Sequence, residues 1–216
     1  MIRDNFSKIL REAMSEDSWV ISEDQYDAKK NLQFESLFAL SNGYMGIRGV
    51  QEEGNHPSLP YVYINGIFDK SETFMRELVT LPNWSELKFY VEKQLLSVER
   101  CEILEYRRAL DLKTATLYKH VLLRDESGRE SLIESVRFLS RENVHRMGMK
   151  VYFTPLNYDG ILEIESSING SILNFCDAPR FKVKHSVVTE NSVKEDNIYL
   201  EVETRDDMLH IGTGAS

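Results

Sequence analysis

Residues 42–49 read Asn-Gly-Tyr-Met-Gly-Ile-Arg-Gly, and this stretch decides how the first part of the chain is interpreted. The dipeptide Asn42-Gly43 is favoured in two-residue hairpin turns, because both central positions of a type I′ turn need a positive φ. We therefore expect a strand at residues 35–41, a turn at Asn42-Gly43 and a returning strand at residues 44–50. A phosphate loop or a dinucleotide fingerprint needs a strand–turn–helix context, which this stretch lacks.

The three glycines of this stretch are explained by backbone geometry. We expect Gly43 to form the turn, and Gly46 and Gly49 to allow close packing against a neighbouring layer, as strand glycines often do. The functional alternative rests on Arg48, whose planar guanidinium suits carboxylate or phosphate groups. We expect Arg48 to reach toward a partner domain.

Downstream of about residue 87, apolar and polar residues alternate. Alternating runs with turn signals between them occur at residues 117–123, 133–138, 147–154, 162–168 and 198–203. Alternation with one polar face predicts antiparallel strands that bury their apolar face. Many such strands separated by short turns predict a sandwich or a barrel. The expected fold class is therefore mainly β.

The first residues follow a helical period instead. Ile2, Phe6, Ile9, Leu10 and Ala13 are spaced three and four apart, which predicts a short amphipathic helix. We assign residues 1–18 to an N-terminal helical extension and residues 19–216 to one β-sandwich domain. The helix is expected to pack on the edge of that domain, and a dimer-contact arm is the alternative. Residues 23–33 and 54–60 are interpreted as loops.

Composition excludes several classes of partner. The chain has 216 residues and a net charge of −9, which argues against a nucleic-acid surface. The longest strictly apolar run covers only residues 61–64, so no membrane helix is expected. The first residues lack the apolar core of a signal peptide, which indicates a cytoplasmic protein. Its two cysteines, Cys101 and Cys176, are expected to be reduced thiols.

Candidate catalytic groups are few. Glu163 and Glu165 lie two apart on an expected strand, as do Glu201 and Glu203, so each pair would be separated by roughly 7 Å. That spacing suits an inverting glycosidase. One strand, however, cannot place two carboxylates on opposite sides of a sugar, and a solvated charged face explains both pairs. None of the five histidines stands at metal-ligand spacing from another His or Cys. We expect no catalytic residue, no cofactor and no metal site.

Trp84 has two interpretations. It follows Pro82 and Asn83, which predict a loop, and an exposed indole there would suit stacking on a sugar ring. The alternative is that Trp84 fills an interface with another domain, which is the interpretation we favour.

Four blocks together resemble a known family. Residues 42–49 are followed by Glu52-Glu53, by residues 63–68 and by residues 77–84, in the order and spacing of the N-terminal β-sandwich domain of glycoside hydrolase family 65. That family comprises maltose, trehalose and kojibiose phosphorylases and acid trehalases. The resemblance covers roughly residue 19 to the C-terminus and implies an antiparallel β super-sandwich. It implies that the chemistry resides in a following (α/α)6 barrel, which carries the general acid and the phosphate site.

The resemblance thus implies a non-catalytic domain that serves assembly and braces the barrel. The family's catalytic glutamate has no matching position in this sequence. We expect Asn42, Arg48 and Trp84 to serve interdomain contact, the missing C-terminal barrel to be the partner, and the protein to be a homodimer. We also expect the isolated chain to expose an apolar surface. The alternative is a free-standing carbohydrate-binding module, with Trp84 and tyrosines as a stacking platform.

Overall fold

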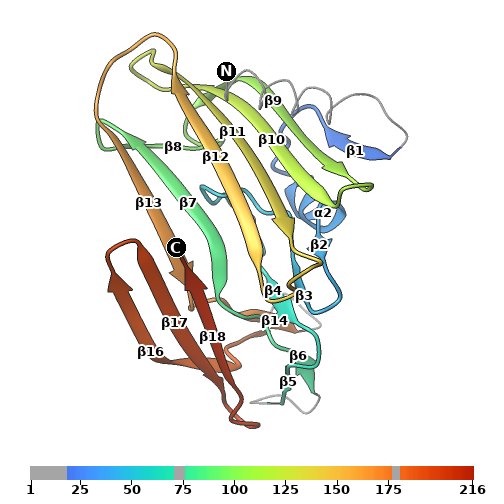
Figure 1. Ribbon diagram of the computed structural model, residues 1–216. Helices are drawn as coiled ribbons and strands as arrows, with labels where there is room; N and C mark the ends of the chain where they lie inside the picture. The colour runs from blue at the N-terminus through green and yellow to red at the C-terminus, as the bar shows by residue number, and fades with distance from the viewer. Residues whose placement is uncertain (1–18, 71–75, 177–180) are drawn as a thin grey trace.

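The computed structural model describes residues 19–70, 76–176 and 181–216. The expected helix at residues 2–14 lies outside these ranges, so the helical extension stays a prediction. Within the described ranges, no helix is long and apolar enough to cross a membrane. Nearly all regular structure consists of antiparallel strands, which confirms the mainly β fold class (Figure 1).

The larger layer is a five-stranded antiparallel sheet. Its order is β1-β9-β10-β11-β12, formed by Val20–Glu23, Glu102–Asp111, Thr116–Arg124, Glu130–Leu139 and Met147–Pro155. The β10–β11 pair aligns Thr116 with Phe138 and Arg124 with Glu130 without a bulge. A turn at residues 125–128 connects these two strands, and Gly128 in this turn has a φ of 79°.

The second layer is a three-stranded sheet of order β13-β7-β8, formed by Leu162–Asn169, Asn83–Val91 and Gln94–Leu96. Side chains from both layers form a shared apolar core that includes Phe89, Val91, Tyr106, Val121 and Ile133. The rings of Phe89 on β7 and Phe153 on β12 stack at 5.6 Å between centroids. Two sheets joined face to face by such a core make a sandwich.

Smaller sheets complete the fold at one end of the sandwich (Figure 1). A C-terminal sheet has the order β16-β17-β18, formed by Ser186–Lys194, Asn197–Thr204 and His210–Ala215, and β17 contacts β13. The remaining strands are β2 (Leu40–Ser41), β3 (Met45–Ile47) and β4 (Val62–Ile64) in one sheet, and two hairpins. These hairpins are β5 (Phe68–Asp69) with β6 (Glu77–Leu78), and β14 (Asn174–Cys176) with β15 (Phe181–Val183).

The expected strand at residues 35–41 is wrong. Residues Asn31–Leu37 form a helix, α2, and only Leu40–Ser41 is a strand. The side chains of Asn31 and Glu35 are one turn apart and fully buried, with a hydrogen bond of 2.8 Å between the Asn31 amide and the Glu35 carboxylate. The buried face of this helix is therefore polar, which hides its helical period from a search for apolar residues.

The hairpin at residues 40–47 is present, but its turn lies one residue further along than expected. Asn42 N donates to the carbonyl of Met45 at 3.1 Å, so Gly43 and Tyr44 are the two loop residues. Only Gly43 has a positive φ, of 90°. Glycine at the first central position is characteristic of a type II′ turn, in which Asn42 keeps ordinary backbone angles.

The other two glycines behave differently from each other. A Cβ atom on Gly49 would lie 2.4 Å from the Cβ of Phe38 and 2.8 Å from its carbonyl oxygen, so the close approach expected at this position is confirmed. The nearest atom to a Cβ on Gly46 would be 3.6 Å away, which is an ordinary contact. Gly49 alone is therefore required by packing.

Candidate functional site

The residues that follow Gly49 are fixed by a buried cluster of charges. Lys119 Nζ on β10 lies 3.1 Å from Glu52 Oε2 and 2.5 Å from Glu53 Oε2. Arg137 Nη2 on β11 lies 2.9 Å from Glu52 Oε1 and donates to the Val50 carbonyl at 3.1 Å. These contacts attach the segment at residues 50–53 to the inner face of the large sheet.

A second group of buried charges continues the cluster along β9. Arg108 Nη2 lies 2.8 Å from Glu23 Oε2, and its Nη1 donates to the Gly49 carbonyl at 2.7 Å. The hydroxyl of Tyr106 donates to the same Glu23 carboxylate at 2.8 Å and accepts from the Gln51 amide at 2.7 Å. We call this group and the preceding one together the buried ion cluster; its charged members are Glu23, Glu52, Glu53, Arg108, Lys119 and Arg137.

The charges of this cluster stabilise one another. Burial alone would raise the pKa of Glu52, but Lys119 and Arg137 outweigh it and hold that pKa well below the usual range for glutamate. Burial alone would lower the pKa of Lys119, but Glu53 and Glu52 outweigh it and raise that pKa. Three carboxylates balance three cations, and all six side chains are buried. We conclude that the cluster is structural, because none of its charges faces solvent.

Asn42 serves the hairpin and a neighbouring turn. Its side-chain oxygen accepts from the backbone N–H groups of Tyr44 and Met45, at 3.1 and 2.9 Å. Its side-chain nitrogen donates to the carbonyls of Ser140 and Val144, at 2.7 and 3.0 Å. The four hydrogen-bonding positions of this amide are thereby occupied within the chain.

Arg48 lies against α2. Its guanidinium donates to Ser36 Oγ at 2.7 Å and to the Leu32 carbonyl at 2.8 Å, and it lies 3.5 Å from Glu35 Oε2. The side chain is 19% exposed, so one side of the guanidinium borders the surface. Arg48 thus fixes α2 to the segment that follows β3 and still contributes to the surface beside it.

The expected loop at Trp84 is wrong, because Trp84 is the second residue of β7. The side chain is 9% exposed and belongs to the apolar core cluster, which leaves no open indole face for a sugar. It lines a small pocket of about 130 Å³ together with Tyr44, Ile64, His145 and Thr213. Within the described residues, the indole Nε1 has no hydrogen-bond partner.

The paired glutamates have ordinary surface contacts. Glu165 Oε1 lies 2.9 Å from Lys88 Nζ, and Glu163 is exposed beside it. Glu201 and Glu203 each lie 2.9 Å from a different ring nitrogen of His210. In the part of the chain that the structure describes, no group of three His, Cys, Asp or Glu side chains is placed to hold a metal.

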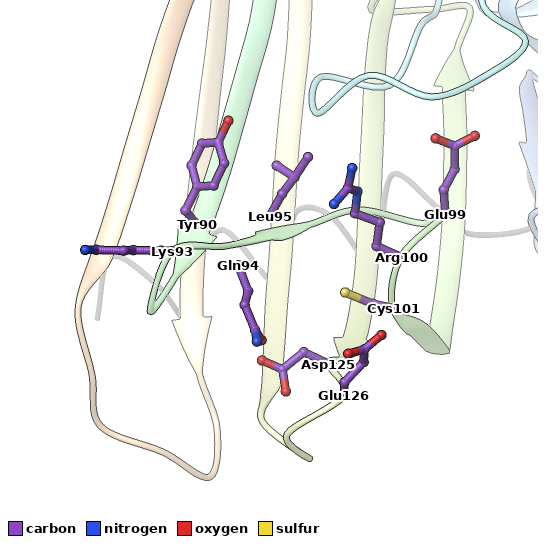
Figure 2. A pocket seen from close by; sticks show the side chains of 9 residues that line it. All are labelled: Tyr90, Lys93, Gln94, Leu95, Glu99, Arg100, Cys101, Asp125 and Glu126. Carbon is purple, nitrogen blue, oxygen red and sulfur yellow. The ribbon is translucent and has the colours of Figure 1, made fainter.

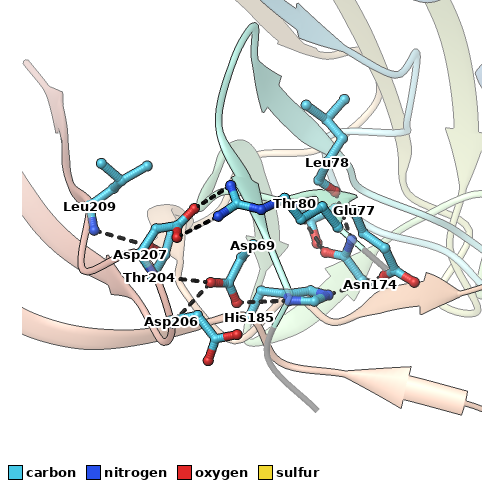
Figure 3. Close-up of polar contacts among 11 residues, drawn as sticks. Asp69, Glu77, Leu78, Thr80, Asn174, His185, Thr204, Asp206, Asp207 and Leu209 are labelled. Carbon is cyan, nitrogen blue, oxygen red and sulfur yellow. Dashed lines mark hydrogen bonds and ion pairs between the residues drawn. The ribbon is translucent and has the colours of Figure 1, made fainter. Parts of the chain in front are cut away.

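A polar cluster near the C-terminal sheet was missed by the sequence reading. The ring of His185 is fully buried, with Nδ1 3.0 Å from Asp69 Oδ2 and Nε2 3.1 Å from Glu77 Oε2 (Figure 3). Asp69 Oδ1 also accepts from the backbone N–H groups of Asp206 and Asp207. This contact joins the β5–β6 hairpin to the turn between β17 and β18. No local motif signals it, because His185 lies more than a hundred residues from both carboxylates in the sequence.

Comparison with known proteins decides the family. The profile described as "Glycosyl hydrolase family 65, N-terminal domain" matches residues 21–216. The chain belongs to this family. Over 217 aligned residues it is 41% identical to the kojibiose phosphorylase of Thermoanaerobacter brockii, an alignment that covers 100% of this chain and 28% of that protein.

Other proteins similar to this glycosyl hydrolase family 65 domain support the same family assignment. The kojibiose phosphorylase of Caldanaerobacter subterraneus subsp. tengcongensis is 41% identical over 97% of this chain and 27% of its own length. The α,α-trehalose phosphorylase of Thermoanaerobacter brockii is 26% identical over 77% of this chain. A solved structure from the human microbiome, provisionally named kojibiose phosphorylase, shares the fold with a TM-score of 0.78 at 18% identity, covering 89% of this chain and 26% of its own.

The chain spans little more than a quarter of the length of the kojibiose phosphorylases that it matches. The structure explains why the sequence blocks shared with the family are needed. Residues 42–53 form a hairpin, a close approach at Gly49 and the carboxylate side of the buried ion cluster. These blocks therefore specify the fold of the domain.

Proposed function

We propose that this chain is the N-terminal domain of a disaccharide phosphorylase that acts on an α-glucosidic linkage, with kojibiose as the first substrate to test. The observation that carries the proposal is 41% identity to a kojibiose phosphorylase along the whole chain. The parent reaction is inverting cleavage by phosphate, in which an acidic residue outside this chain protonates the leaving oxygen. The domain contributes no catalytic group of its own, and its role is to assemble with the (α/α)6 barrel and brace it.

The surface around the Trp84 pocket is the part of the domain that suits contact with the barrel. The pocket is small and lined largely by apolar side chains, and the buried Trp84 indole N–H has no acceptor among the described residues. A buried donor without a partner is costly, so a carbonyl or carboxylate from another domain would be favoured there. Asn42 supports this region by fixing the turn that holds Tyr44, and Arg48 borders the surface next to α2.

Two preparations test the proposal: the 216-residue chain, and a longer polypeptide in which a catalytic domain follows it. Glucose 1-phosphate release from kojibiose, maltose and trehalose is measured with and without inorganic phosphate. We expect turnover by the longer polypeptide only, and only with phosphate. Phosphate-independent glucose release would indicate a hydrolase instead, and turnover by the short chain would contradict its non-catalytic role.

The bracing role has its own test. In the longer polypeptide, Trp84→Phe keeps most of the apolar contact but removes the indole N–H. We expect a lower melting temperature for the longer polypeptide and an unchanged Michaelis constant for the disaccharide, because a contact remote from the substrate does not alter substrate binding. The same substitution in the isolated chain should have a smaller effect. A higher Michaelis constant at unchanged stability would favour the carbohydrate-binding module.

A further inference from the structure

A second, larger pocket lies at the opposite end of the sandwich from the Trp84 pocket. Its volume is about 620 Å³, and its walls come from the end of β7, from β8, from the loop after β8 and from the β10–β11 turn (Figure 2). Pockets of roughly 300–1,000 Å³ accommodate small organic ligands. The size therefore suits a ligand of one or two sugar rings.

Part of the wall is rigid because its polar groups are engaged within the chain. Asp125 accepts from Arg129 Nε at 2.7 Å and from the backbone N–H groups of Ser127 and Arg129. These contacts outweigh the effect of burial and lower the pKa of Asp125, so it stays a carboxylate. Arg129 also donates to Gln94 Oε1 at 2.8 Å, which fixes the amide of Gln94.

Other groups around the pocket are uncommitted. Within the described residues, Arg100, Lys93 and Glu126 make no side-chain hydrogen bond or ion pair, and the Gln94 amide nitrogen has no acceptor. Figure 2 shows the lining on both sides of the β8 backbone: Gln94, Cys101, Asp125 and Glu126 lie on one side, and Tyr90, Leu95 and Arg100 lie on the other. Lys93 points away from both groups, so the pocket extends around the edge of β8. The free groups thus comprise two cationic donors, one amide donor and one carboxylate acceptor.

This mixture selects a class of ligand. A phosphate or sulfate would meet Lys93 and Arg100, but it would be repelled by Glu99, Asp125 and Glu126 on the same wall. A neutral polyol avoids that repulsion, because each hydroxyl both donates and accepts a hydrogen bond. Arg100 and Glu126 have planar forks that suit paired neighbouring hydroxyls, while Leu95 and the Tyr90 ring offer apolar surface to the C–H side of a sugar ring.

We propose that this pocket, which we call the β8 pocket, binds a neutral α-glucoside of one or two sugar rings. The choice of an α-glucoside rests on the proposed function, whereas the preference for a neutral polyol rests on the pocket alone. Arg100, Gln94 and Glu126 hydrogen-bond the hydroxyl groups. Leu95 and Tyr90 contact the apolar side of the ring.

Cys101 allows a direct test, because a ligand in the β8 pocket covers its thiol. The variant Cys176→Ser leaves Cys101 as the only cysteine of the 216-residue chain. Burial raises the pKa of the Cys101 thiol, so alkylation by iodoacetamide is followed at mildly alkaline pH. We expect kojibiose, maltose or trehalose to slow alkylation along a saturable curve, and inorganic phosphate and sulfate to leave it unchanged.

Two further variants in the Cys176→Ser background locate the ligand. Arg100→Ala and Glu126→Ala each remove a polar contact and should raise the sugar concentration that gives half-protection by about tenfold. The exposed Arg141 provides a matched control outside the β8 pocket, and Arg141→Ala should leave that concentration unchanged. Saturation-transfer NMR with the same sugars and variants gives a second readout that does not depend on the thiol.

Four outcomes would overturn the proposal. The first is no protection by any of the sugars, and the second is protection by phosphate or sulfate instead. The third is a half-protection concentration in Arg100→Ala and Glu126→Ala equal to that of the Cys176→Ser parent, and the fourth is a rise in Arg141→Ala as large as in those two variants. Failure here is distinguishable from failure of the proposed function. Phosphorolysis by the longer polypeptide without protection of Cys101 rejects only the β8 pocket. Protection by sugar without phosphorolysis rejects only the phosphorylase assignment.

Discussion

Replacement of Lys119 by methionine is the most direct test of the buried ion cluster. The Lys119 side chain is 3% exposed, and its ammonium group is shared by Glu52 and Glu53 at 3.1 and 2.5 Å. Glu52 retains Arg137 in the variant, at 2.9 Å. Glu53 retains no other ion-pair partner among the described residues, so Lys119→Met leaves one negative charge buried without compensation.

The expected magnitude follows from that unpaired charge. Removing one partner of a buried ion pair costs about 3–5 kcal/mol in the free energy of unfolding. In a domain of this size each kcal/mol changes the melting temperature by about 2–4 °C, so Lys119→Met should lower it by about 6–20 °C. Urea unfolding followed by circular dichroism at neutral pH measures the free energy. The exposed Lys29 supplies the control, and Lys29→Met should change stability by about 0.5 kcal/mol or less.

A double variant decides whether the charge is the cause. Glu53→Gln removes the unpaired charge from the Lys119→Met background and should recover part of the lost stability. The coupling free energy between the two positions should be about 0.5–3 kcal/mol. Additive effects of Lys119→Met and Glu53→Gln, or a loss below about 1 kcal/mol in Lys119→Met, would refute the view that Lys119 neutralises Glu53.

Three further predictions concern stability, each measured by urea unfolding. Gly49→Ala should lower the free energy of unfolding by about 1–3 kcal/mol or more, because the new Cβ would lie 2.4 Å from the Cβ of Phe38. Gly46→Ala should lower it by about 0.5 kcal/mol or less, and equal losses in the two variants would contradict this explanation. The fold lowers the pKa of Glu52, so this residue stabilises the folded state above about pH 4.3, and that stabilisation is lost as the pH falls through the lowered value. Acidification below about pH 4.3 should therefore destabilise the wild type more steeply than Glu52→Gln. Parallel pH profiles would show that Glu52 is not responsible. His185→Gln should cost about 1–3 kcal/mol, because it removes the buried ring that hydrogen-bonds the Asp69 and Glu77 carboxylates, and an unchanged unfolding midpoint would argue against the contact.

The strands of the large sheet could be predicted because their inner faces repeat every second residue. Residues 117–123 lie within β10, and residues 133–138 lie within β11, as their alternation indicates. The same alternation also indicates the buried ion cluster. Lys119 and Arg137 stand in phase with apolar residues such as Leu117 and Val121, and a cation at such a position indicates a buried carboxylate partner.

The candidate sites were less predictable, because their residues meet only in the folded chain. The β8 pocket combines Tyr90 of β7 with Glu126 of the β10–β11 turn, and no local pattern joins them. The prediction of a loop at Trp84 rests on Pro82 and Asn83, which precede it, whereas β7 begins at Asn83 immediately after the proline. A proline before the first strand residue is compatible with a strand, so the sequence allowed either interpretation. The interdomain roles of Asn42 and Arg48 stay predictions.

The edge strand β13 has a consequence for the handling of this protein in solution. Leu162 and Ile164 are 37% and 56% exposed, although the alternation predicted that this face would be buried. Exposed apolar residues on an edge strand invite pairing between molecules, and interspersed charges oppose it. Glu163 and Glu165 supply those charges, and the Lys88 hydrogen bond lowers the pKa of Glu165. Acid that neutralises the carboxylates of this strand would remove that opposition, so the colloidal stability of dilute preparations depends on keeping the buffer above the range in which glutamate side chains protonate.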